Sequence, residues 1–100
     1  IVVSQGESGF YEAEMQTKLM SILNSLFPIS LLYNFSNLTY PGGLWSFSFA
    51  SKGLHPINDF KEERVKESGL KFGYYNKDIH KAAFSLPSFM KNKLAPYLKN

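Results

Sequence analysis

The sequence predicts an α/β fold in which a helix lies between two strands and the last strand turns back antiparallel to the others. Three observations support this prediction. A short β-branched run precedes a helical pattern, two runs of period two follow it, and a Pro-Gly-Gly turn joins those two runs. This order is typical of the closing half of an α/β sheet. A hydrophobic fraction of 44% in 100 residues is enough for one packed core.

The first two elements are a strand and a helix. Residues 1–5 are β-branched and predict a buried strand, which the turn-forming residues 6–9 end. The helix is predicted over residues 10–27, and Pro28 ends it. Its apolar positions, which fall on one helical stripe, are Met15, Leu19, Ile22, Leu23 and Leu26.

The next two elements form a hairpin. Residues 29–35 and 45–49 alternate between apolar and polar side chains, as strands do. Tyr40 and Pro41 stand at the turn between them, and Trp45 follows it. If residues 29–38 run parallel to residues 1–5, Gln5 and Tyr40 reach the same edge of the sheet, where ligands of open α/β sheets collect. The alternative is a turn tyrosine that packs on its own hairpin.

The remaining residues predict surface structure and short helices. Residues 51–69 have a charged middle and predict an excursion with one or two helical turns. Asn76 or Asp78 is a candidate N-cap for a helix that follows, and a second short helix begins near Pro87 and runs toward Leu98.

Composition excludes several classes of partner. The net charge of +3 is mild, and the basic residues are scattered, which argues against nucleic-acid binding. The chain has no cysteine and no apolar run near the about 18 residues that span a bilayer. We therefore expect a cytoplasmic protein with neither a membrane nor a nucleic acid as its partner.

Few residues suit catalysis or metal binding. His55 and His80 lie far apart in the sequence, without ligand spacing, so no metal site is predicted, and no serine lies in a Gly-x-Ser-x-Gly elbow. Glu7 stands where a phosphate loop would need a neutral residue, and a carboxylate suits a cationic ligand better. Glu7 could pair with Glu12 or Glu14 for acid–base chemistry, although carboxylates also stabilise a helix start.

Four blocks carry a resemblance to a known family. They are Ser-Gln-Gly-Glu-Ser at residues 4–8, Leu-Phe-Pro at 26–28, Thr-Tyr-Pro-Gly-Gly-Leu-Trp at 39–45 and Tyr-Tyr-Asn-Lys-Asp-Ile-His-Lys-Ala-Ala-Phe-Ser-Leu-Pro at 74–87. In order and spacing the chain resembles the C-terminal part of the spermidine synthases, which are polyamine aminopropyltransferases. The resemblance covers nearly all 100 residues, and its last block is the most specific.

The resemblance implies a fold, a reaction and a site. The fold would be the C-terminal part of a class I methyltransferase-like Rossmann domain, so residues 1–100 would be one partial domain. The enzyme would transfer an aminopropyl group from decarboxylated S-adenosylmethionine to the diamine putrescine, giving spermidine and methylthioadenosine. Gln5, Tyr40 and Pro41 would line the diamine pocket, and Trp45 stands beside them where the family often has a branched aliphatic residue. No cofactor is implied.

The resemblance also implies what this chain lacks. The family's loop for the aminopropyl donor and its aspartate-rich catalytic segment lie upstream of residue 4, so the chain would carry no catalytic residue and be inert alone. The block at residues 74–87 would pack the last helices on the sheet, or contact the diamine or a partner subunit. We expect a homo-oligomer, a dimer or tetramer. The alternative functions are a related methyltransferase-like enzyme and a polyamine-binding module without catalysis.

Overall fold

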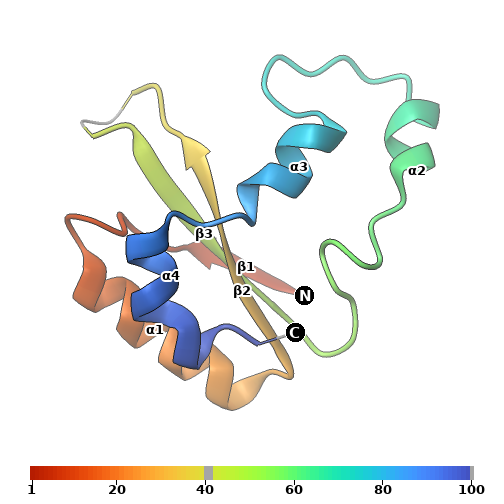
Figure 1. The fold of residues 1–100 in the computed structure, drawn as a ribbon. Helices are drawn as coiled ribbons and strands as arrows, with labels where there is room; N and C mark the ends of the chain where they lie inside the picture. Colours follow the sequence, from red (N-terminus) through yellow and green to blue (C-terminus); the bar gives the residue numbers. More distant parts are fainter. Residues whose placement is uncertain (40–41, 100) are drawn as a thin grey trace.

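Three strands form one antiparallel sheet in the computed structural model, which describes residues 1–39 and 42–99. They are β1 (Val2–Gln5), β2 (Ile29–Ser36) and β3 (Leu44–Ser51), in the order β1-β3-β2 (Figure 1). β3 pairs antiparallel with both neighbours, so β1 and β2 run in the same direction. The predicted α/β fold with a reversed last strand is confirmed, and the reversed strand lies at the centre of the sheet.

The helices lie on both sides of this sheet. α1 (Ala13–Leu26) and α4 (Ser88–Leu94), with a 3-10 turn η1 (Ala95–Tyr97), cover one face. α2 (Glu62–Glu67) and α3 (Lys77–Ala83) lie on the other side, and α3 approaches β2 (Figure 1). The expected excursion with a short helix and the two short C-terminal helices are confirmed.

The core lies between the sheet and the pair α1 and α4. Burying a leucine or methionine side chain stabilises a fold by about 1.5–3 kcal/mol, so this small group carries much of the packing energy. The buried apolar residues are Met20, Leu23, Leu32, Ala50, Met90 and Leu94. On the same face of the sheet, Ser30, Ser46 and Ser48 are completely buried. We call this the serine face.

The predicted stripe of α1 is wrong in part. Met15 and Leu26 are 58% and 67% exposed, whereas Gln16, Met20 and Leu23 are buried. The helix is rotated relative to the expectation because the Gln16 side chain donates hydrogen bonds inside the protein. A buried amide is tolerated when its donors are satisfied, and hydrophobic periodicity does not register it.

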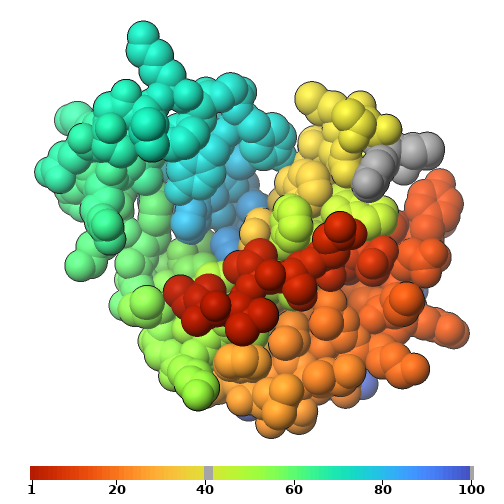
Figure 2. Space-filling model, turned by 180° about the vertical axis from the view of Figure 1, so that it is seen from behind, coloured from red at the N-terminus to blue at the C-terminus, as the bar shows by residue number. Residues whose placement is uncertain are grey.

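The expectation of a buried first strand is also wrong for the described residues. β1 is an edge strand of the sheet, and Val2 and Val3 are 44% and 49% exposed. Figure 2 shows this strand lying across the surface of the molecule. An edge strand presents unpaired backbone groups that can pair with another strand.

Of the two N-cap candidates that the sequence offers for α3, Asn76 and Asp78, the N-cap is Asn76. Its side-chain oxygen accepts a hydrogen bond from the backbone N–H of Ile79 at 2.8 Å. Such a cap satisfies a backbone donor that the first helical turn leaves unpaired. The cap fixes where the chain turns into α3, which carries several of the side chains described below.

Candidate functional site

The site begins at Gln5, the last residue of β1. Gln5 is exposed and pairs with Phe47 of β3, which in turn pairs with Tyr33 of β2. Paired residues of antiparallel strands share a face, so Gln5 lies on the face opposite the serine face. We call this the aromatic face. Because β1 and β2 run in the same direction, the condition set for Gln5 and Tyr40 to approach one edge is met.

The turn after Gln5 has an unusual backbone conformation. Glu7 has a φ of 63°, which lies in the left-handed region that non-glycine residues rarely adopt. Holding such a residue there costs about 1–3 kcal/mol, and it persists only where the surroundings enforce it. A Cβ atom on Gly6, beside it, would lie 2.6 Å from Oγ of Ser46, so a larger residue there would displace this hydroxyl.

Buried hydrogen bonds enforce this turn. The hydroxyl of Ser46 donates to the carbonyl oxygen of Glu7 at 2.6 Å, and Nε2 of Gln16 donates to the carbonyl oxygen of Gly6 at 3.0 Å. The N–H of Gly6 donates to the carbonyl oxygen of Ser46 at 2.8 Å. Sequence reasoning missed Ser46 and Gln16, and the only signal was a serine at alternate positions of β3.

A second serine leads the turn into α1. Oγ of Ser8 accepts the backbone N–H groups of Phe10 and Tyr11 at 3.2 and 3.1 Å. Its carbonyl oxygen accepts the N–H of Glu12 at 3.0 Å. These bonds curl residues 8–12 ahead of the helix and place Glu12 at the N-cap position of α1.

The hairpin turn carries the other predicted residues. Tyr40 and Pro41 lie outside the described residues. Beyond them, Gly42 has a φ of 88°, and a Cβ atom on it would lie 3.0 Å from Cε2 of Tyr11. Gly42, directly after Pro41 in the sequence, therefore lies close to Tyr11 of the segment that follows Gln5.

Trp45 lies on β3 and is half-buried. It pairs with Phe35 of β2 on the aromatic face, the face that Gln5 also occupies. Along β3, Trp45 is two residues closer to the hairpin turn than Phe47, the partner of Gln5. Its indole ring therefore stands on the stretch of sheet between Gln5 and the turn.

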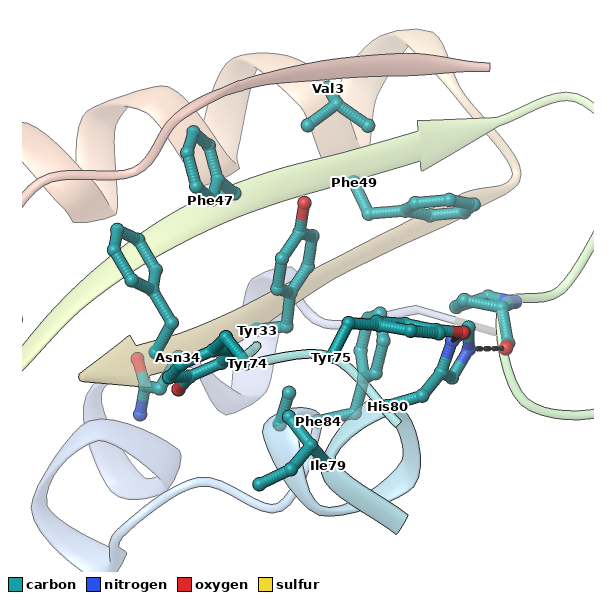
Figure 3. Close-up of a pocket in the computed structure, with 13 residues that line it drawn as sticks. Val3, Tyr33, Asn34, Phe47, Phe49, Tyr74, Tyr75, Ile79, His80 and Phe84 are labelled. Atoms are coloured by element: carbon teal, nitrogen blue, oxygen red, sulfur yellow. Dashed lines mark hydrogen bonds between the residues drawn. The ribbon is translucent and has the colours of Figure 1, made fainter. Parts of the chain in front are cut away.

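A cavity of about 530 Å³ lies on the aromatic face. The hollow is visible in Figure 2 between β1 and the segment with α2 and α3, and Figure 3 shows Tyr33 projecting into its middle. Burial raises the pKa of the Tyr33 hydroxyl. The other lining residues are Val3, Asn34, Phe35, Phe47, Phe49, Pro56, Tyr74, Tyr75, Ile79, His80, Ala83 and Phe84.

The walls of this cavity are held by rings. Phe84 lies 5.1 Å from Tyr33 and 6.3 Å from Phe49 between ring centroids. Such contacts stabilise a fold beyond the area that they bury. The packing role expected for Tyr74, Tyr75 and Phe84 is consistent with these positions, since all three lie between α3 and the sheet.

His80, on α3, contacts the surface excursion at residues 51–69. Its ring contacts the hydroxyl of Tyr75 through Nδ1 at 2.8 Å and the carbonyl oxygen of Pro56 through Nε2 at 2.7 Å (Figure 3). It also stacks on Phe60 at 4.0 Å. A carbonyl oxygen only accepts, so Nε2 carries the proton. Both ring nitrogens are thus used within the fold.

Neither metal ligands nor a membrane segment is found in the described part of the chain. Among residues 1–39 and 42–99, no three His, Asp or Glu side chains gather as a metal site. In the same residues, every helix is too short or too polar to cross a bilayer.

The arrangement matches that of solved enzymes. A crystal structure of spermidine synthase from Thermotoga maritima superimposes with a TM-score of 0.88 at 38% identity, covering 93% of this chain and 33% of that one. A spermidine synthase in complex with the transition-state analogue AdoDATO gives a TM-score of 0.89 at 37% identity, covering 94% of this chain and 33% of the other. The fold is that of one part of the spermidine synthases.

Curated relatives agree. A polyamine aminopropyltransferase from Thermotoga petrophila is 39% identical over 97 residues, covering 88% of this chain. One from Alkaliphilus metalliredigens is 42% identical over 96 residues, covering 94% of it. The chain spans about a third of the length of these relatives, and no family model matches it. The resemblance is confirmed: the chain is homologous to the C-terminal part of the polyamine aminopropyltransferases, a group of transferases.

Proposed function

We propose that this chain is the C-terminal part of a spermidine synthase, which transfers an aminopropyl group from decarboxylated S-adenosylmethionine to putrescine. The observation that carries the proposal is the match to spermidine synthases over 93–94% of the chain, at 37–38% identity and TM-scores of 0.88–0.89. An analogue of the transition state occupies one of those relatives. The order β1-β3-β2, with the reversed strand in the middle, supports a class I methyltransferase-like Rossmann domain.

This segment would supply part of the wall of the diamine pocket. Gln5 lies at the carboxyl end of its strand, and Gly42, which follows Tyr40 and Pro41 in the sequence, lies close to Tyr11 of the segment that follows Gln5. An amide oxygen and a phenol oxygen accept hydrogen bonds from the N–H groups of an amine. Trp45, on the same face as Gln5, would border the methylene chain of the acceptor.

The chemistry needs more than this segment. The lone pair of a neutral amine attacks the carbon bound to the sulfonium, the carbon–sulfur bond breaks, methylthioadenosine leaves, and the new ammonium gives up a proton. That step needs a base and a positioned donor. Since the chain spans about a third of the length of its relatives, we propose that both belong to the remainder of a longer enzyme and that the 100 residues alone are inactive.

The exposed edge of β1 supports a further part of the proposal. Val2 and Val3 are half-exposed on a strand whose outer backbone groups face away from the described sheet. An apolar edge of this kind favours pairing with further strands. We propose further that the whole enzyme is cytoplasmic and acts as a dimer or tetramer.

The test is an assay of aminopropyl transfer by the full-length protein. Putrescine, cadaverine and spermidine are offered as acceptors with decarboxylated S-adenosylmethionine, and methylthioadenosine is measured. Transfer to putrescine with the highest kcat/KM is expected. Transfer of a methyl group from S-adenosylmethionine, with no aminopropyl transfer, would overturn the proposal.

The site is tested in the same protein. Tyr40→Phe removes one acceptor oxygen and keeps the ring, so KM for putrescine should rise about tenfold, the value of one hydrogen bond to an amine. An unchanged KM would remove Tyr40 from the pocket.

A further inference from the structure

We propose that Ser46 and Gln16 are positioning residues that hold the turn after Gln5 in the conformation that binds the acceptor diamine. This inference rests on the proposed function and deepens it. Neither residue lies in the motif blocks that carry the family resemblance, although Ser46 directly follows the block at residues 39–45. Their positioning role is inferred from their hydrogen bonds alone.

Ser46 acts from the central strand. It is completely buried, and its single hydroxyl proton goes to the carbonyl oxygen of Glu7 at 2.6 Å. Oγ of Ser46 itself accepts a hydrogen bond from Nε2 of Gln16 at 3.0 Å, so both the donor and the acceptor role of this hydroxyl are assigned. The backbone carbonyl of Ser46 also accepts the N–H of Gly6. One residue of β3 therefore contacts both residues that follow Gln5.

Gln16 acts from the helix. It is 2% exposed, and its amide nitrogen has two protons. One is directed to the carbonyl oxygen of Gly6 and the other to Oγ of Ser46, each at 3.0 Å. The turn is thus held from β3 and from α1 at the same time. Removal of either side chain leaves a buried polar group without its partner, which is more costly than the loss of a bond at the surface.

The strained backbone conformation of Glu7 depends on these hydrogen bonds. Glu7 has a φ of 63° and is not glycine, so its conformation depends on the hydrogen bonds around it. When the bond to its carbonyl oxygen is removed, Glu7 is free to return to negative φ. That change turns the peptide between Gly6 and Glu7, and we expect it to shift the end of β1 at Gln5.

The two residues act through the backbone and not by touching a ligand. Gln5 and Phe47 share the aromatic face, and Ser46 is the neighbour of Phe47 along β3. Successive side chains of a strand point to opposite faces, so Ser46 lies on the serine face, beneath the turn. This is why a readout of acceptor binding, separate from stability, is needed.

The chain offers a matched control. Ser48 is on the same strand and the same face, is completely buried, and forms its hydrogen bond with Ser4 at 2.6 Å. Among the described residues, its hydroxyl bonds to Ser4 and not to residues 6–8. Ser48→Ala therefore removes a buried hydroxyl of the same kind without releasing the turn.

The experiment compares Ser46→Ala with Ser48→Ala in the full-length protein. KM for putrescine and KM for decarboxylated S-adenosylmethionine are measured, with the melting temperature of each variant. For Ser46→Ala we expect KM for putrescine to rise about tenfold while KM for the donor changes less than about twofold, since one fixed hydrogen bond is lost. Ser48→Ala should leave both KM values near those of the unchanged protein.

A second variant keeps the test decisive if Ser46→Ala fails to fold. Gln16→Met preserves the length of the side chain and removes both donors, and it should raise KM for putrescine in the same selective way. Equal KM values for putrescine in all variants, or equal rises for putrescine and the donor, would overturn the inference while transfer by the unchanged protein upholds the proposed function. No transfer by the unchanged protein would overturn both.

Discussion

The two faces of the sheet are built from different residues and are closed to different degrees. On the serine face, small hydroxyl side chains and Leu32 lie completely buried beneath α1 and α4. On the aromatic face, Tyr33, Phe47 and Phe49 are only half-buried, and a cavity of about 530 Å³ separates them from α3. One strand, β3, contributes Ser46 and Ser48 to the first face and its aromatic rings to the second.

The difference assigns separate tasks to the faces. Small side chains let α1 approach the sheet closely, and their hydroxyl groups fix backbone positions such as the turn at Glu7. Large rings with space between them leave a hollow that packing has not filled, whereas protein interiors are normally close-packed. The serine face therefore fixes the backbone geometry of the turn at Glu7, whereas the aromatic face keeps an open cavity.

The largest expected effect comes from neighbouring leucines that point to opposite faces. Leu32→Ala, on the serine face, should lower the free energy of unfolding by about 2–5 kcal/mol, because the closed core cannot collapse onto the space left behind. Leu31→Ala, on the aromatic face, should cost clearly less because Leu31 is only half-buried. Urea unfolding of the full-length protein measures both.

A surface leucine provides a reference for the stability changes of Leu31→Ala and Leu32→Ala. Leu38 is 90% exposed, so Leu38→Ala should change stability by less than about 0.5 kcal/mol. If Leu31→Ala and Leu32→Ala cost the same, the aromatic face is as tightly packed as the serine face in the full-length protein, and the comparison fails.

The elements of the fold could be predicted where local chemistry decides them. Period two in residues 29–35 and 45–49, the stop at Pro28 and the cap at Asn76 each have a local cause, and each is confirmed. β1 and β2 also run in the same direction, as the predicted approach of Gln5 to the hairpin turn requires.

What could not be predicted depends on contacts between distant residues. Alternation along β3 does not say which face is buried, and it is the serines, not the aromatic rings, that are covered completely. The orientation of α1 is set by Gln16, a polar residue buried by its hydrogen bonds to Gly6 and Ser46. The diamine-binding roles of Gln5, Tyr40, Pro41 and Trp45 stay predictions.

An intermediate effect is expected from adding the same atoms to each face. Ala50 is completely buried on the serine face, so Ala50→Leu should cost about 1–3 kcal/mol through overpacking. Ala83 lines the cavity, so Ala83→Leu should fill space and stabilise by about 0.5–2 kcal/mol. Thermal unfolding of the full-length protein compares them. A similar loss in both variants would mean that another part of the protein already occupies the cavity.

The smallest effect concerns the ion pair between α2 and α3, beyond the aromatic face. Nζ of Lys77 lies 2.7 Å from Oε1 of Glu62, and Lys81 lies 3.7 Å from its other oxygen. The hydrogen bond and charge of Lys77 lower the pKa of Glu62 from its ordinary value of 4.5, and Glu62 raises the pKa of Lys77 from 10.5. These side chains are half-exposed, so water and salt weaken the pair.

The direction of the pH dependence follows from these shifts. A lowered carboxyl pKa contributes stability that is present above pH 4.5 and is lost as the pH falls through the folded value, and a raised lysine pKa contributes stability that is lost as the pH rises beyond 10.5. Glu62→Gln should therefore lower the melting temperature slightly at neutral pH and not at all in acid, where the carboxyl is neutral. Glu63→Gln, at the next residue of α2 and outside this ion pair, is the control. A difference between the two variants that persists in acid or in high salt would show that Glu62 stabilises the contact with α3 by packing and not by charge. The side of the sheet that faces α3 would then be more tightly packed than the comparison of the two faces assumes.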